Sequence, residues 1–171
     1  MQRLVESLGG TAEPVSPHTV RLHTPTLGTT TPDRDGCQKI RASFLLAGPL
    51  LARAGRATLP RPGGDRIGRR PLDTHIHAFQ ELGVEIEISP DSYERSAPNG
   101  LHAADIFLTE MSVMATENVV MAAALTPGTT RIANAASEPH VQDLCHLLTR
   151  MGARIDGIGS RRSEVIIGFA W

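Results

Sequence analysis

The chain has 171 residues, of which 40% are hydrophobic and only 4% are aromatic, and its formal net charge is −1. This length suits one domain, whose core must be built mainly from aliphatic side chains. The near-neutral charge and the scarcity of aromatic rings argue against a nucleic-acid-binding protein, and no apolar run is long enough to predict a membrane helix.

The first predicted element is a helix end that is followed by Gly9 and a short strand. The same pattern recurs at Gly83 and Gly152, which lie 74 and then a further 69 residues along the chain. Glycine adopts the left-handed conformation at low cost, so each of these positions indicates a helix C-terminus. A second pair, Gly55 and Gly128, is 73 residues apart, and each member follows an Ala- and Leu-rich helix. Both sets predict a repeated unit of about 70 residues.

Helices and strands alternate within the predicted units. We expect helices over residues 39–54, 72–82, 116–125 and 139–151, and strands over 57–59, 84–88, 101–108, 129–132 and 165–167. Pro71 and Pro139 fit the first turns of their helices. Strands that alternate with helices in a repeated unit indicate an α/β fold.

The phase of the repeat predicts the organisation of the chain. We expect residues 1–23 to be the tail of a preceding unit, 24–36 an irregular connection, and 37–100 and 101–171 two repeated units. Met1 falls inside the helix of a unit whose first half is absent, so we expect a fragment or a product of an internal start. Cys37 and Cys145 lack a CxxC spacing and no signal-peptide core follows Met1, which predicts a cytoplasmic protein with free thiols.

Residues 59–73 form the most informative segment, because they hold three Gly, three Pro, four Arg and two Asp. Gly and Pro permit unusual backbone angles, and Arg binds anions bidentately. Asp65 lies beside two glycines, so the segment predicts a site for a phosphorylated or carboxylated ligand with an acid close to it. Taken alone, Asp65 fits a loop aspartate in an Asx-turn better than a catalytic acid, and Arg41 and Arg70 fit solvated surface arginines better than anion-binding residues.

Five motifs resemble those of UDP-N-acetylglucosamine enolpyruvyl transferases, which are more distantly related to EPSP synthase. The motifs are RASFLLAGPL (41–50), GGDRIGRRPLD (63–73) with His75, ELG (81–83), SVMATEN (112–118) and NAASEP (134–139). The resemblance implies an inside-out α/β barrel domain of repeated βαβαββ units, with helices inside and sheets outside. From the same resemblance we expect about two units plus the tail of a third in this chain, without the family's second domain.

The resemblance also implies an activity. Family members transfer the enolpyruvyl group from phosphoenolpyruvate to the 3-hydroxyl of UDP-N-acetylglucosamine and release phosphate, which is the first committed step of peptidoglycan synthesis. They need no cofactor and no metal. Asp65 occupies the position of the usual loop cysteine, so its implied role is to protonate the methylene carbon of phosphoenolpyruvate. Fosfomycin alkylates that cysteine, and we expect it not to inactivate an enzyme that carries Asp65, because a carboxylate is the weaker nucleophile.

Further site residues follow from the same resemblance. Arg70 is implied to act in catalysis and to bind both substrates, and Arg41 is implied to bind an anionic group. The implied uridine site comprises Pro71, Leu72, Asp73 and Thr74. His75 either joins this site or is a structural histidine. Ser112 and Val113 are implied to form a second segment near the nucleotide. His75 and His77 are two positions apart on a helix and do not share a face, so no metal site is predicted.

The alternative is a catalytically silent, truncated α/β domain that at most binds a nucleotide. In the family the active site lies between two domains, and groups from the other domain have no counterpart in this chain. We therefore expect weak or absent turnover from the 171 residues alone.

Overall fold

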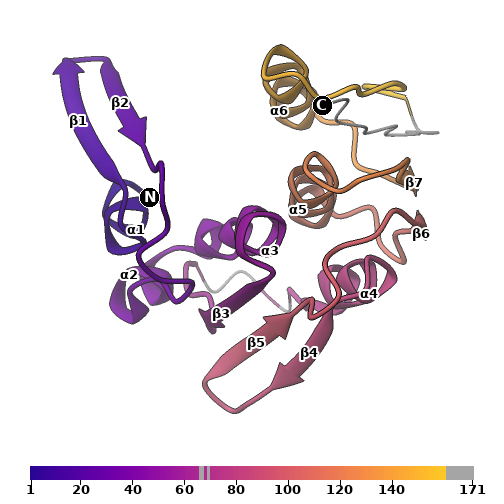
Figure 1. Ribbon diagram of the computed structural model, residues 1–171, viewed down its shortest axis with the longest axis horizontal. Helices are drawn as coiled ribbons and strands as arrows, with labels where there is room; N and C mark the ends of the chain where they lie inside the picture. The colour runs from indigo at the N-terminus through magenta and orange to yellow at the C-terminus, as the bar shows by residue number, and fades with distance from the viewer. Residues whose placement is uncertain (66–67, 69, 161–171) are drawn as a thin grey trace.

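The computed structural model describes residues 1–65, 68 and 70–160 (Figure 1). Its elements in chain order are α1 (Gln2–Ser7), β1 (Thr11–Ser16), β2 (Thr19–His23), α2 (Arg34–Lys39), the 3₁₀ helix η1 (Arg41–Leu46), α3 (Ala47–Ala54), β3 (Arg56–Pro60), α4 (Asp73–Glu81), β4 (Glu85–Ile88), β5 (Ser92–Ser96), β6 (Asp105–Phe107), α5 (Val113–Ala123), β7 (Arg131–Ala133) and α6 (Pro139–Arg150). This mixture of helices and strands confirms the predicted α/β class.

The described strands form three small sheets. Strands β1 and β2 make an antiparallel hairpin, β5 pairs antiparallel with both β3 and β4, and β6 pairs parallel with β7. Parallel neighbours need a crossover, and α5 supplies it in the β6–α5–β7 unit. In Figure 1 the sheets lie at the periphery while α3 and α5 lie between them, and the described strands do not join into a closed barrel.

Helices α3 and α5 form the centre of the core. Both are rich in small and aliphatic side chains, and Leu50, Leu51, Val119 and Val120 are at most 2% exposed. A Cβ on Gly48 would lie 2.3 Å from the Asn118 carbonyl oxygen, so a glycine is required where the two backbones meet. The buried character expected of both helices is confirmed.

The predicted helix-terminal glycines are also confirmed. Gly9, Gly83 and Gly152 follow the ends of α1, α4 and α6 with φ values of 94°, 87° and 106°. Gly55 and Gly128 have φ values of 66° and 99°. These left-handed angles explain why glycine recurs at these positions.

The single helix predicted over 39–54 is wrong, because Lys39 is the last residue of α2, Ile40 is not helical, and residues 41–54 form η1 and α3. Ile40 is extended, with φ −137° and ψ 136°, and it separates the end of α2 from η1. The Cys37 carbonyl accepts a hydrogen bond from the Gly63 N–H at 3.1 Å, and the Ile40 carbonyl accepts one from the Ser43 hydroxyl at 2.8 Å. Carbonyls that a continuous helix would use are therefore taken by other donors.

Other boundaries differ from the sequence prediction. Pro71 precedes the N-cap residue Leu72 and so lies outside α4, whereas Pro139 is in the first turn of α6 as predicted. The strand expected over 101–108 shortens to β6, and the strand expected over 129–132 shifts to β7, which ends at Ala133. Helix α2 begins within the predicted irregular connection, and β2 and β5 were not predicted. The strand expected over 165–167 lies outside the described residues. No helix in the described part of the chain is long and apolar enough to span a bilayer.

Candidate active site

A series of hydrogen bonds links the three residues that the sequence places at the centre of the site. Arg41, the first residue of η1, donates from Nη2 to the Arg70 backbone carbonyl at 2.7 Å. Arg70 donates from Nη2 to the Asp65 backbone carbonyl at 2.8 Å. Each arginine uses one donor to order the loop and has further N–H groups available for an anion.

Two glycines determine the path of the loop before Asp65. The Gly63 N–H donates to the Cys37 carbonyl, and a Cβ at Gly63 would lie 1.5 Å from the Gln38 carbonyl oxygen. Gly64 has a φ of 94° and lies against the backbone nitrogen of Arg41. Any larger residue at Gly63 would push the loop away from the end of α2, so this Gly-Gly pair holds the loop beside Arg41.

A groove of about 320 Å³ opens where the loop meets strand β5. It is lined by Arg41, Arg61, Pro62, Arg70, Pro71, Leu72 and Tyr93. Four predicted site residues therefore share one surface. Burial lowers the pKa of Arg41, with a further contribution from the charge of Arg70, which shows that positive charge is concentrated at the groove. Asp65 is exposed and does not line the groove.

Arg61 and Tyr93 are groove residues that the sequence reasoning missed. Arg61 belongs to the same Pro- and Arg-rich segment, so its position was visible, but the motif comparison gave it no role. Tyr93 is the only tyrosine of the chain, and it reaches the groove from β5, a strand that was not predicted. Only the pairing of β5 with β3 brings the two residues together.

Helix α4 places its first residues in different surroundings. Asp73 is exposed, whereas Thr74 and His75 are buried. The Thr74 hydroxyl lies 3.2 Å from that of Thr109, which links α4 to the segment before α5. None of the three lines the groove.

His75 is held by helix contacts. Its Nδ1 lies 3.2 Å from Nδ2 of Asn118, and its ring meets the Phe44 ring edge-on with centroids 5.0 Å apart. Burial, followed by the charges of Arg41 and Arg95, lowers its pKa to about 3. Histidine is therefore neutral here, and Nδ1 accepts the hydrogen bond from the Asn118 amide.

Ser112 and Val113 begin helix α5. The Ser112 hydroxyl accepts a hydrogen bond from the Ala115 N–H at 3.3 Å, so it is a helix N-cap, and Val113 is the first helical residue. They do not line the groove, and the Thr74–Thr109 contact connects their segment to α4.

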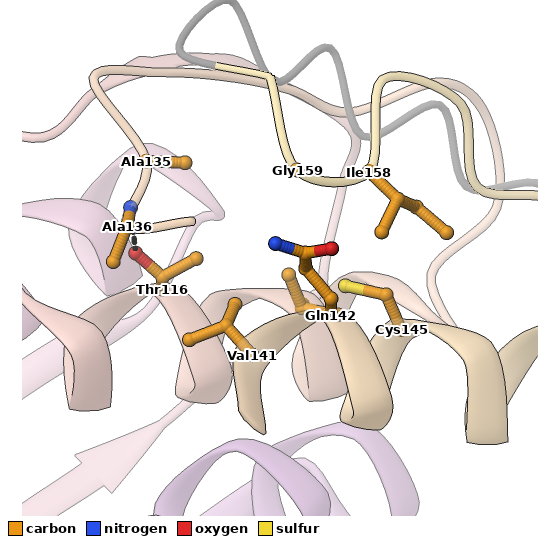
Figure 2. Close-up of a pocket in the computed structure, with 9 residues that line it drawn as sticks. Thr116, Ala135, Ala136, Val141, Gln142, Cys145, Ile158 and Gly159 are labelled. Carbon is orange, nitrogen blue, oxygen red and sulfur yellow. Dashed lines mark hydrogen bonds between the residues drawn. The ribbon is translucent and has the colours of Figure 1, made fainter. Parts of the chain in front are cut away.

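A second hollow lies between α5, α6 and residues 158–159, but it is too small for a nucleotide. Figure 2 shows Thr116, Gln142 and Cys145 directed into it, with Ala136 donating its N–H to the Thr116 hydroxyl at 3.0 Å. Its volume of about 10 Å³ corresponds to roughly one water molecule. Within the described residues, no three His, Cys, Asp or Glu side chains gather as metal ligands.

Comparisons with known proteins agree with the predicted resemblance. The family model for EPSP synthase (3-phosphoshikimate 1-carboxyvinyltransferase) matches residues 1–170. The chain is 52% identical over 160 residues to the UDP-N-acetylglucosamine 1-carboxyvinyltransferase of Treponema pallidum (strain Nichols), covering 94% of the chain and 37% of that protein. It is 50% identical over 157 residues to the protein of the same name from Bradyrhizobium diazoefficiens, covering 92% of the chain and 36% of that protein.

Solved structures show the same fold. The enolpyruvyl transferase NikO of Streptomyces tendae superposes with a TM-score of 0.79 at 19% identity, covering 97% of this chain and 38% of that one. The EPSP synthase of Acinetobacter baumannii gives 0.63 at 15% identity, covering 90% and 36%. The predicted EPSP synthase-like α/β fold is therefore confirmed, and the chain spans about 37% of the length of its Treponema relative. On the match over residues 1–170, the chain belongs to the EPSP synthase (3-phosphoshikimate 1-carboxyvinyltransferase) family.

Proposed function

We propose that these 171 residues carry part of the active site of a UDP-N-acetylglucosamine 1-carboxyvinyltransferase. The observation that carries the proposal is the hydrogen-bonded series from Arg41 through Arg70 to Asp65 beside a cationic groove. It occurs in a chain that is 52% identical to a relative of that name. The proposed substrates are UDP-N-acetylglucosamine and phosphoenolpyruvate.

Asp65 is the proposed proton donor to the methylene carbon of phosphoenolpyruvate. Protonation turns the methylene into a methyl group and leaves a cationic centre at carbon 2, which the 3-hydroxyl of the sugar attacks as its own proton passes to a base. A base then removes a proton from the methyl group as phosphate leaves, and the enolpyruvyl product forms. Aspartic acid is ionised in bulk water, so the proposal requires that the loop excludes water around Asp65 or that the substrate brings the proton. Arg70 supports this step because its hydrogen bond to the Asp65 carbonyl orders the backbone of the donor.

The anionic groups of the substrates are proposed to bind Arg41 and Arg70, whose guanidinium groups match phosphoryl and carboxylate oxygens. Pro71 and Leu72 line the same groove and are proposed to contact the uridine. Asp73 and Thr74 follow directly at the start of α4, with His75 packed behind them. Ser112 and Val113 are proposed to approach the nucleotide from the N-terminus of α5.

The proposal includes the remainder of a two-domain enzyme as the partner of this chain. Residues 1–23 are proposed as the tail of a first unit, joined through 24–36 to units at 37–100 and 101–171, in a cytoplasmic enzyme without a metal or cofactor. The competing proposal, a silent domain that at most binds a nucleotide, is favoured by one observation: Asp65 is exposed and is not among the residues that line the groove.

A chimeric enzyme separates these two proposals. Residues 1–160 of this chain replace the matched segment of the Treponema pallidum relative, and phosphate release is measured with UDP-N-acetylglucosamine and phosphoenolpyruvate. We expect turnover by the chimera and weak or no turnover by the 171 residues alone. A chimera that folds, binds UDP-N-acetylglucosamine and releases no phosphate would reject the transferase and leave the silent domain.

An Asp65→Asn variant of the chimera is the matched test of the proton donor. It keeps the size and the backbone hydrogen bond of the loop but has no acidic proton. Turnover is expected to fall by at least about 100-fold, the usual range for loss of a general acid. An Asp91→Asn variant changes an exposed aspartate that pairs with Arg34, and it should leave turnover unchanged.

A further inference from the structure

The groove contains a third arginine whose side chain has no anionic partner among the described residues. Arg61 follows strand β3 and lines the groove with Arg41 and Arg70. Its backbone N–H donates to the Asp91 carbonyl at 3.2 Å, which anchors the main chain, but no ion pair of its guanidinium occurs within the described part of the protein. An exposed guanidinium without a carboxylate partner has its N–H donors available for an anion.

The Tyr93 ring gives this arginine a defined position. The Arg61 Cζ lies over the ring, 5.6 Å from its centroid, and Tyr93 is paired with Leu59 of the adjoining strand. A guanidinium stacked on an aromatic face is held in orientation while its N–H edge stays free to bind an anion. Arg61 is therefore oriented by the fold before any ligand arrives.

A buried arginine lies against the same ring. Arg95 is only 2% exposed, and its Cζ is 5.2 Å from the Tyr93 centroid and 4.5 Å from the Phe44 centroid. Its Nη1 donates to the Tyr93 carbonyl at 3.4 Å, whereas its Nε and Nη2 have no hydrogen-bond partner among the described residues. A buried, unpaired cation is costly, and a negative charge bound nearby would offset that cost.

We propose that Arg61, held on Tyr93, is a further anion-binding residue of this groove and takes a phosphoryl group of a substrate. Arg61 extends the anion site of Arg41 and Arg70 toward β5, and the buried charge of Arg95 strengthens the positive potential behind it. The inference rests on the proposed function for the identity of the substrate that carries this phosphoryl group. Two sources fit this chemistry, the diphosphate of the sugar nucleotide and the phosphate of phosphoenolpyruvate.

Steady-state kinetics of the chimeric enzyme test the inference and distinguish the two sources. Arg61→Gln is expected to raise the KM of one substrate by about tenfold, the usual effect of losing a hydrogen bond to a charged group. A rise for UDP-N-acetylglucosamine assigns the diphosphate, and a rise for phosphoenolpyruvate assigns its phosphate. Arg61→Lys should restore part of the loss, and Tyr93→Leu should weaken binding because it removes the ring that orients Arg61. Values of KM within about twofold of the parent for both substrates overturn the inference.

Arg56→Gln is the matched control. It removes the same charge from the other end of β3, where Arg56 is exposed on a surface with Glu85, Glu87 and Glu94 and away from the groove. It is expected to leave both KM values unchanged. If Arg56→Gln acts like Arg61→Gln, the effect comes from net charge and the assignment of Arg61 is overturned.

A binding measurement keeps the inference separate from the proposed reaction. Calorimetry on the 171-residue chain, with inorganic pyrophosphate as the probe, is expected to show binding that Arg61→Gln weakens and Arg56→Gln does not. If this holds while the chimera releases no phosphate, the proposed reaction fails and the inference stands. If the wild-type chain does not bind pyrophosphate, or binds it no better than Arg61→Gln, the inference fails even where turnover is observed.

Discussion

Acidification should destabilise this protein through His75. Its pKa in the folded chain is about 3, against an ordinary value of 6.5, because burial and the charges of Arg41 and Arg95 oppose protonation. Between these two pH values the unfolded chain binds one more proton than the folded chain. The stability contributed by neutral His75 is therefore fully present above pH 6.5 and is lost as the pH falls toward 3.

The size of the effect follows from the shift. Each pH unit below the unfolded pKa removes about 1.4 kcal/mol, so lowering the pH from 7 to 5 should cost His75 about 2 kcal/mol of unfolding free energy. The loss is a substantial part of the about 5–15 kcal/mol that stabilises a typical domain. The other titrating groups contribute as well, so the quantity to compare is the difference between wild type and a variant.

Urea denaturation at pH 7 and pH 5 supplies that difference. A His75→Gln variant should lose about 2 kcal/mol less than wild type on acidification, because it cannot take up the proton. His77→Gln is the control on the same helix, since His77 is far more exposed and lies 3.8 Å from Glu81. A direct check is an NMR titration of wild-type His75, which should show no titration between pH 7 and pH 5. A midpoint near 6.5, or equal pH dependence in wild type and His75→Gln, would refute the reasoning.

Three further predictions concern the helix core and the loop. Asn118→Ala leaves two buried backbone groups, the Gly48 N–H and the Phe44 carbonyl, without the amide that they pair with. Urea denaturation should therefore show an unfolding free energy lower by about 2–5 kcal/mol, whereas Asn99→Ala, at an exposed position, should change it little. Gly63→Ala places a methyl group against a backbone carbonyl and should lower the free energy of unfolding by about 1–3 kcal/mol, whereas Gly28→Ala meets only ordinary contacts. Thermal melts that show no loss of stability for either variant would contradict the loop geometry. In the chimera, Asp65→Cys should confer time-dependent inactivation by fosfomycin with a covalent adduct visible by mass spectrometry, and an adduct on Asp65 itself would contradict the expected resistance.

Much of the fold follows from local sequence. The glycines after α1, α4 and α6 mark helix ends because few other residues take a positive φ without strain. The alternation of elements and the aliphatic composition predicted α/β packing with buried helices. Boundaries were less predictable, and β5 was missed because Ser92–Ser96 carries the charged pair Glu94 and Arg95 and has little apolar alternation.

The helix break at Ile40 shows why local sequence is insufficient. Residues 39–54 are apolar on nearly every side of a helix, so their composition alone predicts one buried helix. The structure divides them because a loop that follows in the sequence donates to the Cys37 carbonyl, and this contact exists only in the folded chain. The break at Ile40 also places Arg41 at the start of η1, where its side chain donates to the Arg70 carbonyl.

The sequence by itself determined the family, the residue types of an anion site and the presence of an acid in the loop, since these depend on residue identity and spacing. Only the tertiary structure decided that Arg41, Arg70 and the unpredicted Arg61 and Tyr93 share one groove, and that His75 is buried and neutral. The physical reason is that the pairing of β3 with β5 and the packing of α4 on α5 join residues that lie far apart along the chain. A pattern of neighbouring residues carries no information about such contacts, which also set the pKa of a buried histidine.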